Sequence, residues 1–313
     1  MAPAEDGDTD DDDDGGLLAE FVGLGLALAI LLVVLGYLGW LFAFGDSLAV
    51  GRGYAVAAVL VLAIAASFYG MRIAAFWSIL FALAAGAPVV LATLWSGPPG
   101  EFTLYQKNLL YKNADLAGLE ADIRAADPMA LTVQEVSGPN LALLAALADR
   151  MPHQHVCANT NEGGATIGGT AVATRLPPVP GATICAPGLA AMQVMWTETQ
   201  REVPVWIVSV HLTWPWPKDQ AAHAAALREV LSGLEGPVVM AGDFNMVPWG
   251  ASVRSLAQAA GTVAAGPSPG TFIGFDPVLR LPIDHAFGPN GGRITLRPAL
   301  GSDHLGLFVE LQP

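Results

Sequence analysis

Three long apolar segments occupy the first hundred residues, and they constrain the fold more than any other feature of the sequence. The segments cover residues 17–44, 53–70 and 73–95. A helix needs about 20 apolar residues to cross the hydrocarbon core of a bilayer; the first and third segments reach this length and the second approaches it. The chain is 53% hydrophobic, with a mean hydropathy of +0.48, which is too apolar for an ordinary soluble enzyme. We therefore predict an integral protein of the inner or plasma membrane, with an N-terminal bundle of about three transmembrane helices.

Charge gives little guidance to the orientation of these helices. The segment at residues 53–70 either crosses the bilayer or forms a re-entrant or interfacial piece. If all three segments cross, Arg52 and Arg72 lie on opposite sides, and the positive-inside rule is tied. Three spans also separate the N-terminus from the C-terminal domain. An acidic N-terminus in the cytoplasm places that domain on the periplasmic or extracellular side, which we prefer although Lys107 and Lys112 argue weakly against it.

Residues 1–16 form a strongly acidic stretch, with eight Asp and Glu among the first fourteen residues. Asp10, Asp12 and Asp14 match part of a calcium-binding loop. The twelfth position of that loop should be Glu, but it is Phe21, inside the first apolar segment. Blocks of like charge repel one another and are usually disordered. We therefore predict a solvated, disordered tail rather than a calcium site.

The two cysteines, Cys157 and Cys185, leave the redox environment open. Neither belongs to a CxxC pair or to a Cys/His spacing of the kind that binds zinc, so we expect no zinc site. Two unpaired buried thiols are one interpretation. A single disulfide is the other, if the C-terminal domain faces an oxidising compartment.

A Gly-Pro-Pro-Gly sequence at residues 97–100 separates the membrane region, residues 17–96, from a domain that covers residues 97–313. A segment of this length suits one α/β domain. Apolar runs that predict strands occur at residues 102–106, 130–133, 153–158, 169–174, 192–197, 203–210, 238–240, 283–287, 293–297 and 305–310. Amphipathic stretches predict helices at residues 114–125, 140–150, 220–234 and 251–260.

The charge of this domain limits its substrates. It carries 12 Lys and Arg against 18 Asp and Glu, a net charge of −6. Proteins that bind nucleic acid tightly without sequence preference usually present a basic surface. A phosphate ester that is small, or that metal ions hold, therefore fits this composition better than a polyanion does.

Polar side chains border many of the expected strands. In the stretch VVMAGDFN, Asp243 and Asn245 follow a buried strand, and their spacing places both side chains on one face of an extended chain. We expect them to converge at one mouth of a sheet with the other polar residues at strand ends: Asn108, Glu135, His211, Asp284, Asp303 and His304. Carboxylates at this density repel one another unless a cation is present, and oxygen ligands favour Mg²⁺ or Mn²⁺.

Seven motifs occur in order along the domain: Asn-Leu-Leu, Gln-Glu, Gly-Gly-Thr-Ala-Val-Ala-Thr-Arg, Ser-Val-His-Leu, Gly-Asp-Phe-Asn, Ile-Asp-His and Ser-Asp-His. From about Phe102 to Leu311, the sequence resembles the endonuclease/exonuclease/phosphatase superfamily of deoxyribonuclease I-like proteins. Each motif is weakly specific, but their order is highly specific. The resemblance implies a four-layer α/β sandwich, in which helices flank two packed β-sheets. It also implies a hydrolase that uses Mg²⁺ or Mn²⁺ for in-line attack of water on a phosphodiester or phosphomonoester.

The resemblance assigns metal binding and proton transfer to two groups of residues. It implies that Glu135 is the main metal ligand and that Asn108 helps it. It pairs Asp284 with His304 as a dyad, in which Asp284 orients the imidazole and His304 activates water or binds the phosphate. Asp303 would assist at the metal or at the dyad.

The remaining catalytic roles also follow from the resemblance. Asp243 and Asn245 would position the nucleophile and stabilise the pentacovalent state. His211 would contact the phosphate or protonate the leaving oxygen. His285 neighbours Asp284 but points to the other face of its strand, so we expect it to be structural.

Two further residues are candidate substrate contacts, and each has a structural alternative. Arg175 ends an expected strand, where it contacts substrate or forms a packing or salt-bridge contact. Trp214 lies in a Trp-Pro-Trp-Pro loop after His211, where it stacks on a base, contacts a lipid or covers the core. The substrate class stays open between a nucleic acid and a lipid or small molecule. A non-catalytic membrane binding module is a third hypothesis. We infer no protein partner.

Overall fold

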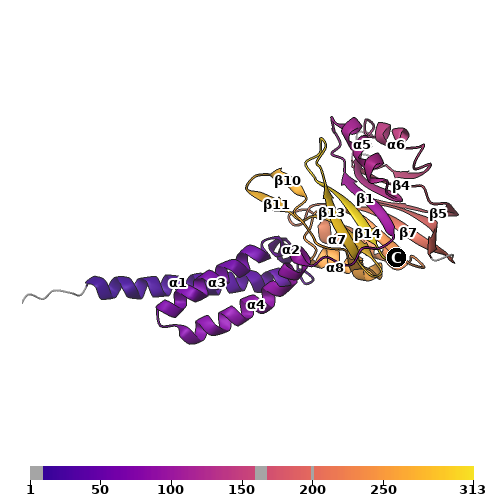
Figure 1. The fold of residues 1–313 in the computed structure, drawn as a ribbon. Helices are drawn as coiled ribbons and strands as arrows, with labels where there is room; N and C mark the ends of the chain where they lie inside the picture. The colour runs from indigo at the N-terminus through magenta and orange to yellow at the C-terminus, as the bar shows by residue number, and fades with distance from the viewer. Residues whose placement is uncertain (1–9, 159–167, 199–200) are drawn as a thin grey trace, which may run out of the picture. The chain divides into compact units, whose positions relative to one another are not determined.

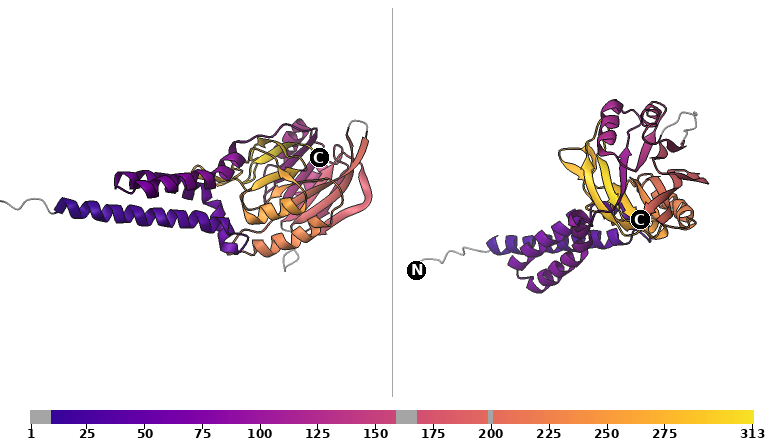
Figure 2. Two further views of the ribbon diagram at one scale, coloured as in Figure 1. Left: turned by 90° about the horizontal axis from the view of Figure 1, so that it is seen from below. Right: turned by 45° about the vertical axis from the view of Figure 1, so that its right-hand side comes forward.

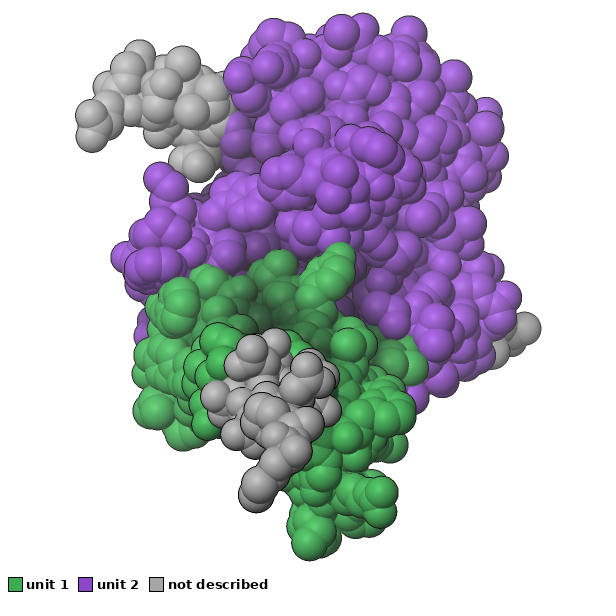
Figure 3. Space-filling model, turned by 90° about the vertical axis from the view of Figure 1, so that its left-hand side faces the viewer, with its two compact units in different colours: residues 1–90 green, residues 91–313 purple. Residues whose placement is uncertain are grey.

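The computed structural model describes residues 10–158, 168–198 and 201–313 (Figure 1). Contacts between residues divide the chain into two compact units, Met1–Val90 and Leu91–Pro313, which Figure 3 shows in separate colours.

The N-terminal unit is helical. Its helices are α1 (Asp10–Tyr37), α2 (Ala43–Val50), α3 (Arg52–Phe68) and α4 (Arg72–Leu94), the last of which continues past the boundary between the units. Residues 16–37 and 72–94 are long and apolar enough to cross a membrane. Helices α2 and α3 are bent by 68° and together form a third candidate, which is either a broken span or a re-entrant loop. The expected apolar helical region, with two or three candidate spans, is therefore confirmed.

The boundaries of two N-terminal segments differ from those expected. The apolar segment over residues 17–44 is not one helix, because α1 ends at Tyr37 and α2 begins at Ala43. The chain folds back so tightly here that a Cβ on Gly39 would lie 2.8 Å from the Cα atom of Asp46. Of the expected acidic tail, residues 1–9 lie outside the described residues, and α1 already begins at Asp10.

Arg52 is not a solvated loop charge. It is only 3% exposed, its guanidinium lies 3.8 Å from the centroid of the Tyr37 ring, and Nη2 donates to the Gly36 carbonyl at 2.6 Å. The residue belongs to the packing of α1 against α3, so it carries little weight as one of the two arginines in the orientation argument.

The C-terminal unit contains two six-stranded sheets. The first has the order β13 (Gly292–Arg297), β14 (Gly306–Leu311), β1 (Phe102–Asn108), β2 (Ala130–Val136), β4 (Gly169–Thr174) and β3 (His153–Cys157). The second has the order β5 (Pro178–Ala186), β6 (Leu189–Glu198), β7 (Arg201–His211), β8 (Val238–Asp243), β12 (Asp284–Gly288) and β9 (Val263–Ala264). A separate hairpin consists of β10 (Phe272–Phe275) and β11 (Leu279–Leu281).

Helices cover the outer face of each sheet, as Figures 1 and 2 show. Helices α5 (Leu116–Ala126) and α6 (Leu141–Ala146) pack on the first sheet through a continuous apolar cluster. Helices α7 (Gln220–Ser232) and α8 (Ala251–Ala259) lie on the second sheet. A separate buried cluster fills the space between the sheets. The expected four-layer α/β sandwich is confirmed.

Side-chain alternation explains how each strand of the first sheet serves two cores. Along β2, Ala130 points into the core between the sheets, whereas Leu131 and Val133 point toward α5 and α6. Buried strands of this kind consist of continuous apolar runs, which is why the sequence predicts them well.

Four strands were not expected: β5, β9, β10 and β11. Strand β5 contains Pro178, Pro180 and Gly181, which usually indicate a turn or loop. It is tolerated because it lies at the edge of its sheet, where its register with β6 shifts between Pro178 and Thr183.

Candidate functional site

The second sheet aligns three polar side chains on adjacent strands. The parallel register of β7 and β8 pairs His211 with Asp243, and the antiparallel register of β8 and β12 pairs Asp243 with Asp284. The strand-end pattern in the sequence therefore becomes a lateral row across one edge of the sheet. The Nε2 atom of His211 lies 3.7 Å from Oδ2 of Asp243.

Asn108 connects this row to the first sheet. Its Nδ2 group donates to Oδ2 of Asp243 at 2.9 Å and to Oε1 of Glu135 at 3.1 Å. Its Oδ1 atom accepts from the Leu110 backbone N–H at 3.0 Å. Asn108 is fully buried at the end of β1 and holds two carboxylates side by side. In this arrangement it orients Glu135 directly.

A β-bulge turns Glu135 toward the site. The register of β2 against β4 shifts between Val133 and Val136, and Glu135 has a left-handed φ of 55°. Regular alternation would point this side chain toward α5 and α6, because Gln134 already faces the core between the sheets. The bulge redirects it to the sheet edge instead. There its Oε2 atom accepts from the Tyr111 N–H at 2.9 Å, and Asn140 Nδ2 donates to its carbonyl at 3.0 Å.

His304 and Asp284 form a tight pair. The Nδ1 atom of His304 donates to Oδ2 of Asp284 at 2.7 Å, and Gln106 Nε2 donates to the other oxygen of Asp284 at 2.8 Å. This arrangement leaves Nε2 of His304 3.7 Å from Oδ2 of Asp243. The ring of Phe272 packs against the imidazole with 5.1 Å between centroids. Asp284 thus fixes the orientation of the imidazole, and Nε2 is the nitrogen that faces the other carboxylate.

Burial and mutual charge shift the pKa values of this cluster. Burial raises the pKa of Asp243 well above its ordinary value, although His304 partly opposes this shift. Burial acts in the same direction on Asp284, but the charge and hydrogen bond of His304 hold its pKa below the ordinary value. Burial lowers the pKa of His304, but the charges of Asp284 and Asp243 outweigh it and raise the pKa. The direction of this pKa shift favours the protonated form of His304.

The donor set fits a hard divalent cation. Oxygen or nitrogen atoms of Asp243, Asp284 and His304 lie within 4.8 Å of one another. The buried Oδ1 atoms of Asn245 and Asp303 have no hydrogen-bond partner. Buried acceptors without partners are costly, and oxygen ligands of this kind are those that Mg²⁺ and Mn²⁺ prefer. The residues present thus fit the cation that the sequence predicts.

Asn245 and Asp303 occupy positions beside the cluster. The Nδ2 group of Asn245 donates to the Leu212 carbonyl at 2.7 Å, and its backbone N–H donates to Oδ1 of Asp243 at 2.8 Å. It has a left-handed φ of 48°, which asparagine tolerates better than most residues. Asp303 is half-buried, and its carbonyl accepts from the N–H of Ile273 at 2.9 Å.

Arg175 is not brought to this cluster. It follows β4, whose Thr174 pairs with Ala130 at the beginning of β2, whereas Glu135 stands near the end of that strand. The guanidinium forms an ion pair with Asp127 at 3.0 Å. The structure therefore places Arg175 at the opposite end of the sheet, in the salt-bridge arrangement that the sequence left as its alternative.

Trp214 reaches the site through an aromatic neighbour. Its ring packs edge-on against Phe272 at 5.8 Å, and Phe272 in turn contacts His304. Trp214 is 42% exposed, and the hairpin of β10 and β11 adds Phe275 and Val278, which are 53% and 89% exposed. The hairpin projects from the sheets in Figure 1. An exposed apolar rim therefore lies next to the dyad.

Several residues that hold the dyad in place were not predicted from the sequence to have this role. Gln106 Nε2 donates to Gln134 Oε1 at 2.9 Å, and Gln134 Nε2 donates to Ser209 Oγ at 2.9 Å. This buried chain crosses between the sheets and ends on Asp284. On the other face of β1, Lys107 Nζ donates to three carbonyls, of which that of His304 lies at 2.5 Å. A signal was present, because Gln106 precedes Asn108 by two residues and must share its face.

Comparisons with known proteins agree with this architecture. A family model described as the endonuclease/exonuclease/phosphatase family matches residues 96–304. No relative among the curated proteins matches the sequence. A solved structure of an endonuclease/exonuclease/phosphatase family protein from Leptotrichia buccalis C-1013-b is 14% identical with a TM-score of 0.52, covering 68% of this chain and 100% of that chain.

Two further solved structures are similar. One is a humanized D. rerio TDP2 with 14 mutations, which is 17% identical with a TM-score of 0.50, covering 66% of this chain and 97% of its own. The other is SmcL, which is 14% identical with a TM-score of 0.50, covering 68% and 99%. At these identities the likeness concerns the fold.

Proposed function

Because the chain belongs to the endonuclease/exonuclease/phosphatase family, whose members hydrolyse phosphoester bonds, we propose that it is a membrane-anchored phosphoesterase that depends on a divalent metal. It cleaves a phosphodiester or phosphomonoester by in-line attack of water. The observation that carries this proposal is the convergence of a buried His304–Asp284 pair with Asp243, Asn108 and Glu135 across the edges of two sheets.

The metal site of this proposal is built on Glu135, with Asn108 as the residue that orients it and Asp303, whose Oδ1 has no hydrogen-bond partner, as a further candidate ligand. Mg²⁺ or Mn²⁺ held there would polarise a phosphoryl oxygen and offset the charge that develops in the transition state. Glu135 is already restrained by Asn108 and by the Tyr111 N–H, so its carboxylate needs little reorganisation to serve as a ligand.

The directions of the pKa shifts favour different roles for Asp243 and His304, with Asp243 as the base and His304 as a hydrogen-bond donor. A buried carboxyl with a raised pKa is a competent base near neutral pH, so we assign to Asp243 the proton of the attacking water. A protonated His304 donates from Nε2 to a non-bridging phosphate oxygen, and Asp284 holds its ring. A bond forms from the water oxygen to phosphorus, and the bond to the leaving oxygen breaks.

His211 and Asn245 complete the arrangement. His211 is partly exposed on the side of Asp243 away from Asp284, since the register places the three residues in a row. From that position it supplies a proton to the leaving oxygen. The peptide N–H of Asn245 fixes Oδ1 of Asp243, which leaves Oδ2 to face both imidazoles.

The surroundings favour a substrate with an apolar part. The domain has a net charge of −6, and Trp214, Phe275 and Val278 give the rim next to His304 an apolar surface. A polyanion gains little from such a surface, whereas a phospholipid presents a phosphodiester joined to an apolar body. We therefore propose a lipid or small-molecule phosphodiester as the substrate, and cleavage of nucleic acid is the second candidate.

The apolar helices support anchoring in the inner or plasma membrane. If the bent pair of α2 and α3 crosses together with α1 and α4, the N-terminus and the catalytic unit lie on opposite sides. With the acidic N-terminus in the cytoplasm, we place the catalytic unit on the periplasmic or extracellular side. Alkaline extraction of membranes tests the anchoring, and protection of the catalytic unit from protease in sealed vesicles tests the side. Release by alkali would contradict the anchored state.

The activity is tested with the full-length chain in detergent micelles. It is incubated with Mg²⁺, Mn²⁺ or EDTA and offered bis-p-nitrophenyl phosphate, phospholipid vesicles and plasmid DNA in parallel. His304→Ala is compared with His153→Ala, which alters a half-buried histidine of β3 outside the site. We expect metal-dependent turnover of the diester and of lipid, lost in His304→Ala and kept in His153→Ala.

Each other outcome changes a defined part of the proposal. Nicking of DNA without lipid turnover would make the protein a nuclease despite its acidic domain. Turnover that persists in His304→Ala would remove the dyad from the mechanism. A folded chain that binds Mg²⁺ but cleaves none of the three probes would favour the non-catalytic binding module.

A further inference from the structure

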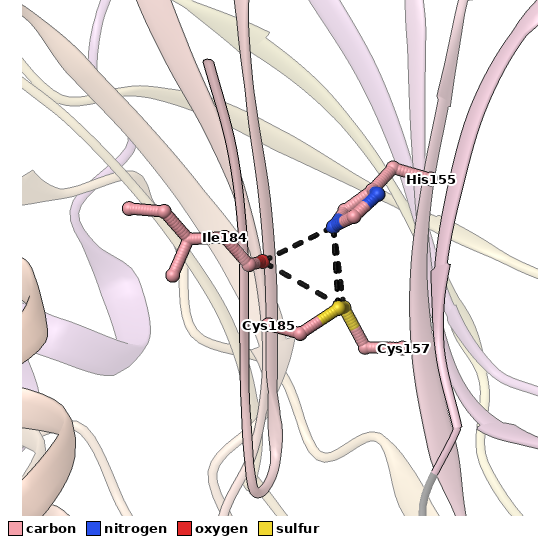
Figure 4. The surroundings of a disulfide bond; sticks show 4 residues. All are labelled: His155, Cys157, Ile184 and Cys185. Atoms are coloured by element: carbon pink, nitrogen blue, oxygen red, sulfur yellow. Dashed lines mark hydrogen bonds between the residues drawn. A yellow bond between two sulfur atoms is a disulfide. The ribbon is translucent and has the colours of Figure 1, made fainter. Parts of the chain in front are cut away.

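A cluster of soft ligands lies outside the phosphoesterase site, where the edges of the two sheets meet (Figure 4). His155 and Cys157 are two residues apart on β3, so both point to the same face of that strand. Cys185 comes from β5, and a disulfide joins it to Cys157. Strands β3 and β5 are the edge strands of the first and second sheets, so the disulfide connects the two sheets.

The position of His155 is not needed for a disulfide. Its Nε2 atom lies 3.3 Å from the Sγ atom of Cys157 and 3.3 Å from that of Cys185. The Ile184 carbonyl oxygen lies 3.2 Å from the same nitrogen and 3.6 Å from Sγ of Cys157. One imidazole nitrogen thus faces both sulfurs at equal distance, and Figure 4 shows the donor atoms gathered at one point. Three of them are a ligand set for a thiophilic ion.

We propose that the dithiol form of the protein binds Zn²⁺ through Sγ of Cys157, Sγ of Cys185 and Nε2 of His155. A dithiol or phosphine reductant supplies two electrons, the S–S bond breaks, and the two sulfurs take up two protons. Binding of Zn²⁺ then displaces those two protons and forms two zinc–thiolate bonds and one zinc–imidazole bond. Two thiolates and a neutral imidazole balance the charge of the ion, which suits a partly buried position.

The surroundings permit both steps. Cys185 is exposed, so a reductant can reach the disulfide, and Cys157 is 6% exposed, which shields one side of the ion. An open pocket of about 300 Å³ lies against both cysteines, with Ala158 and Thr170 in its wall. It leaves room for a water molecule as the fourth ligand of a tetrahedral ion.

The sequence argument against zinc considered only spacing along the chain, which cannot detect this set of residues. The third ligand stands 28 residues beyond Cys157 and on a different sheet, so no short motif contains the set. The pairing of strands alone brings a His-x-Cys pair on β3 next to a cysteine on β5.

The bound ion would replace the connection that reduction removes. In the oxidised protein the disulfide ties the two edge strands together; in the reduced protein three metal bonds from the same strands would do so. Zn²⁺ should therefore raise the unfolding temperature of the reduced protein, because it binds the folded state in preference to the unfolded chain. It should not change the unfolding temperature of the oxidised protein by the same route.

Cobalt provides a specific readout, because a thiolate–cobalt bond absorbs in the near ultraviolet and cobalt bound by oxygen and imidazole does not. Full-length protein in detergent is reduced with a phosphine under argon, desalted and titrated with Co²⁺, then with Zn²⁺. We expect the absorption to saturate at one equivalent in the reduced protein, to be absent from the oxidised protein, and to disappear when Zn²⁺ displaces Co²⁺. The phosphoesterase site contributes nothing to this band.

Matched variants identify the ligands. Cys185→Ser should abolish the band, and His155→Gln should weaken cobalt binding at least tenfold. His153→Gln, which changes the histidine two residues earlier on the same strand, should leave it unchanged. His155→Gln keeps the disulfide, so its fold is checked by thermal unfolding in the oxidised state.

Two results would overturn the proposal. One is a folded, reduced protein that shows no thiolate–cobalt absorption. The other is equal cobalt affinity in His155→Gln and the unaltered chain. If the reduced protein loses its near-ultraviolet circular dichroism, recovery of that signal on addition of Zn²⁺ supports the proposal, and failure to recover it contradicts the proposal.

Discussion

The two ends of the β-sandwich both gather charged side chains, but they do so in opposite ways. At the end that carries the candidate active site, Asp243 and Asp284 are almost completely buried and have histidines as their nearest cationic partners. At the other end, Arg124 and Arg175 pair with Asp149 and Asp127 at 2.8 and 3.0 Å, and both carboxylates are more than half exposed.

This difference separates a charged cluster that can take part in catalysis from ion pairs that only lie on the surface. Burial of carboxylates that are not fully paired shifts their pKa values and favours the binding of a cation. Both properties are typical of functional sites. Exposed ion pairs are screened by water and contribute little to stability. The small cavity of about 120 Å³ between Arg124, Arg150 and Arg175 is lined by charges that already have carboxylate neighbours.

The largest effect that separates the two ends should come from His304. Its replacement by alanine removes the donor that faces the phosphate and leaves Asp284 buried without its partner. We expect hydrolysis of bis-p-nitrophenyl phosphate to fall by about 10³-fold, within the range for loss of a donor that stabilises charge developing in the transition state. Initial rates with saturating Mg²⁺ measure it. A loss below tenfold in a folded variant would place His304 outside the reaction.

His285, a buried histidine next to the dyad, tests how burial at the active-site end changes a pKa and, through it, the stability of the protein. Burial lowers the pKa of His285 to about 4, although its hydrogen bond to the Met246 carbonyl opposes the shift. The unfolded chain takes up this proton near pH 6.5, so stability from neutral His285 is complete above that pH and is lost as pH falls toward 4. The loss amounts to about 3 kcal/mol when the pH has fallen to the folded pKa.

Unfolding in denaturant between pH 7 and pH 4 measures this loss. His285→Gln, which keeps a donor for Met246 and cannot titrate, should flatten the dependence of stability on pH. An equal slope in the variant and the unaltered chain would show that His285 does not control it.

Glu135 should show the metal dependence of the site. Glu135→Gln keeps the size of the side chain but removes the charge that we assign to the metal. We expect the Mg²⁺ concentration for half-maximal activity to rise by about 10- to 100-fold. Glu120→Gln, which alters a carboxylate paired with Arg124 at the other end, is the matched control. A similar Mg²⁺ requirement in both variants would remove Glu135 from the metal site.

The smallest effect should come from Arg175. Its replacement by alanine breaks an exposed ion pair with Asp127, so the free energy of unfolding should change by less than about 1 kcal/mol. Activity on bis-p-nitrophenyl phosphate should stay within twofold of the unaltered chain. A tenfold loss of activity would show that Arg175, at the other end of the sandwich, contributes to catalysis.

Much of the fold was predictable because local and global signals agree. The strand at Val238–Asp243 is a continuous apolar run that is buried on both faces, and its polar continuation marks the sheet edge. Strand β5 was missed because its prolines carry a local turn signal, which the edge of a sheet overrides. The region from Tyr37 to Ala43 was predicted as helix because its residues are as apolar as those of the flanking helices. Hydropathy therefore gives no sign that the chain turns back there.

The sequence by itself determined that residues 17–96 are apolar and helical and that the rest is an α/β domain, while the two-sheet arrangement followed from the resemblance carried by its ordered motifs. It also identified which polar residues stand at strand ends, because these properties depend on composition and period along the chain. Only the tertiary structure decided which of those residues meet. Asn108 bridges the two sheets, and a bulge turns Glu135 toward the candidate site. Arg175 lies at the opposite end of its sheet. Cys185 lies next to His155 and Cys157. These outcomes depend on strand pairing and register, which join residues that are distant in sequence and leave no local pattern.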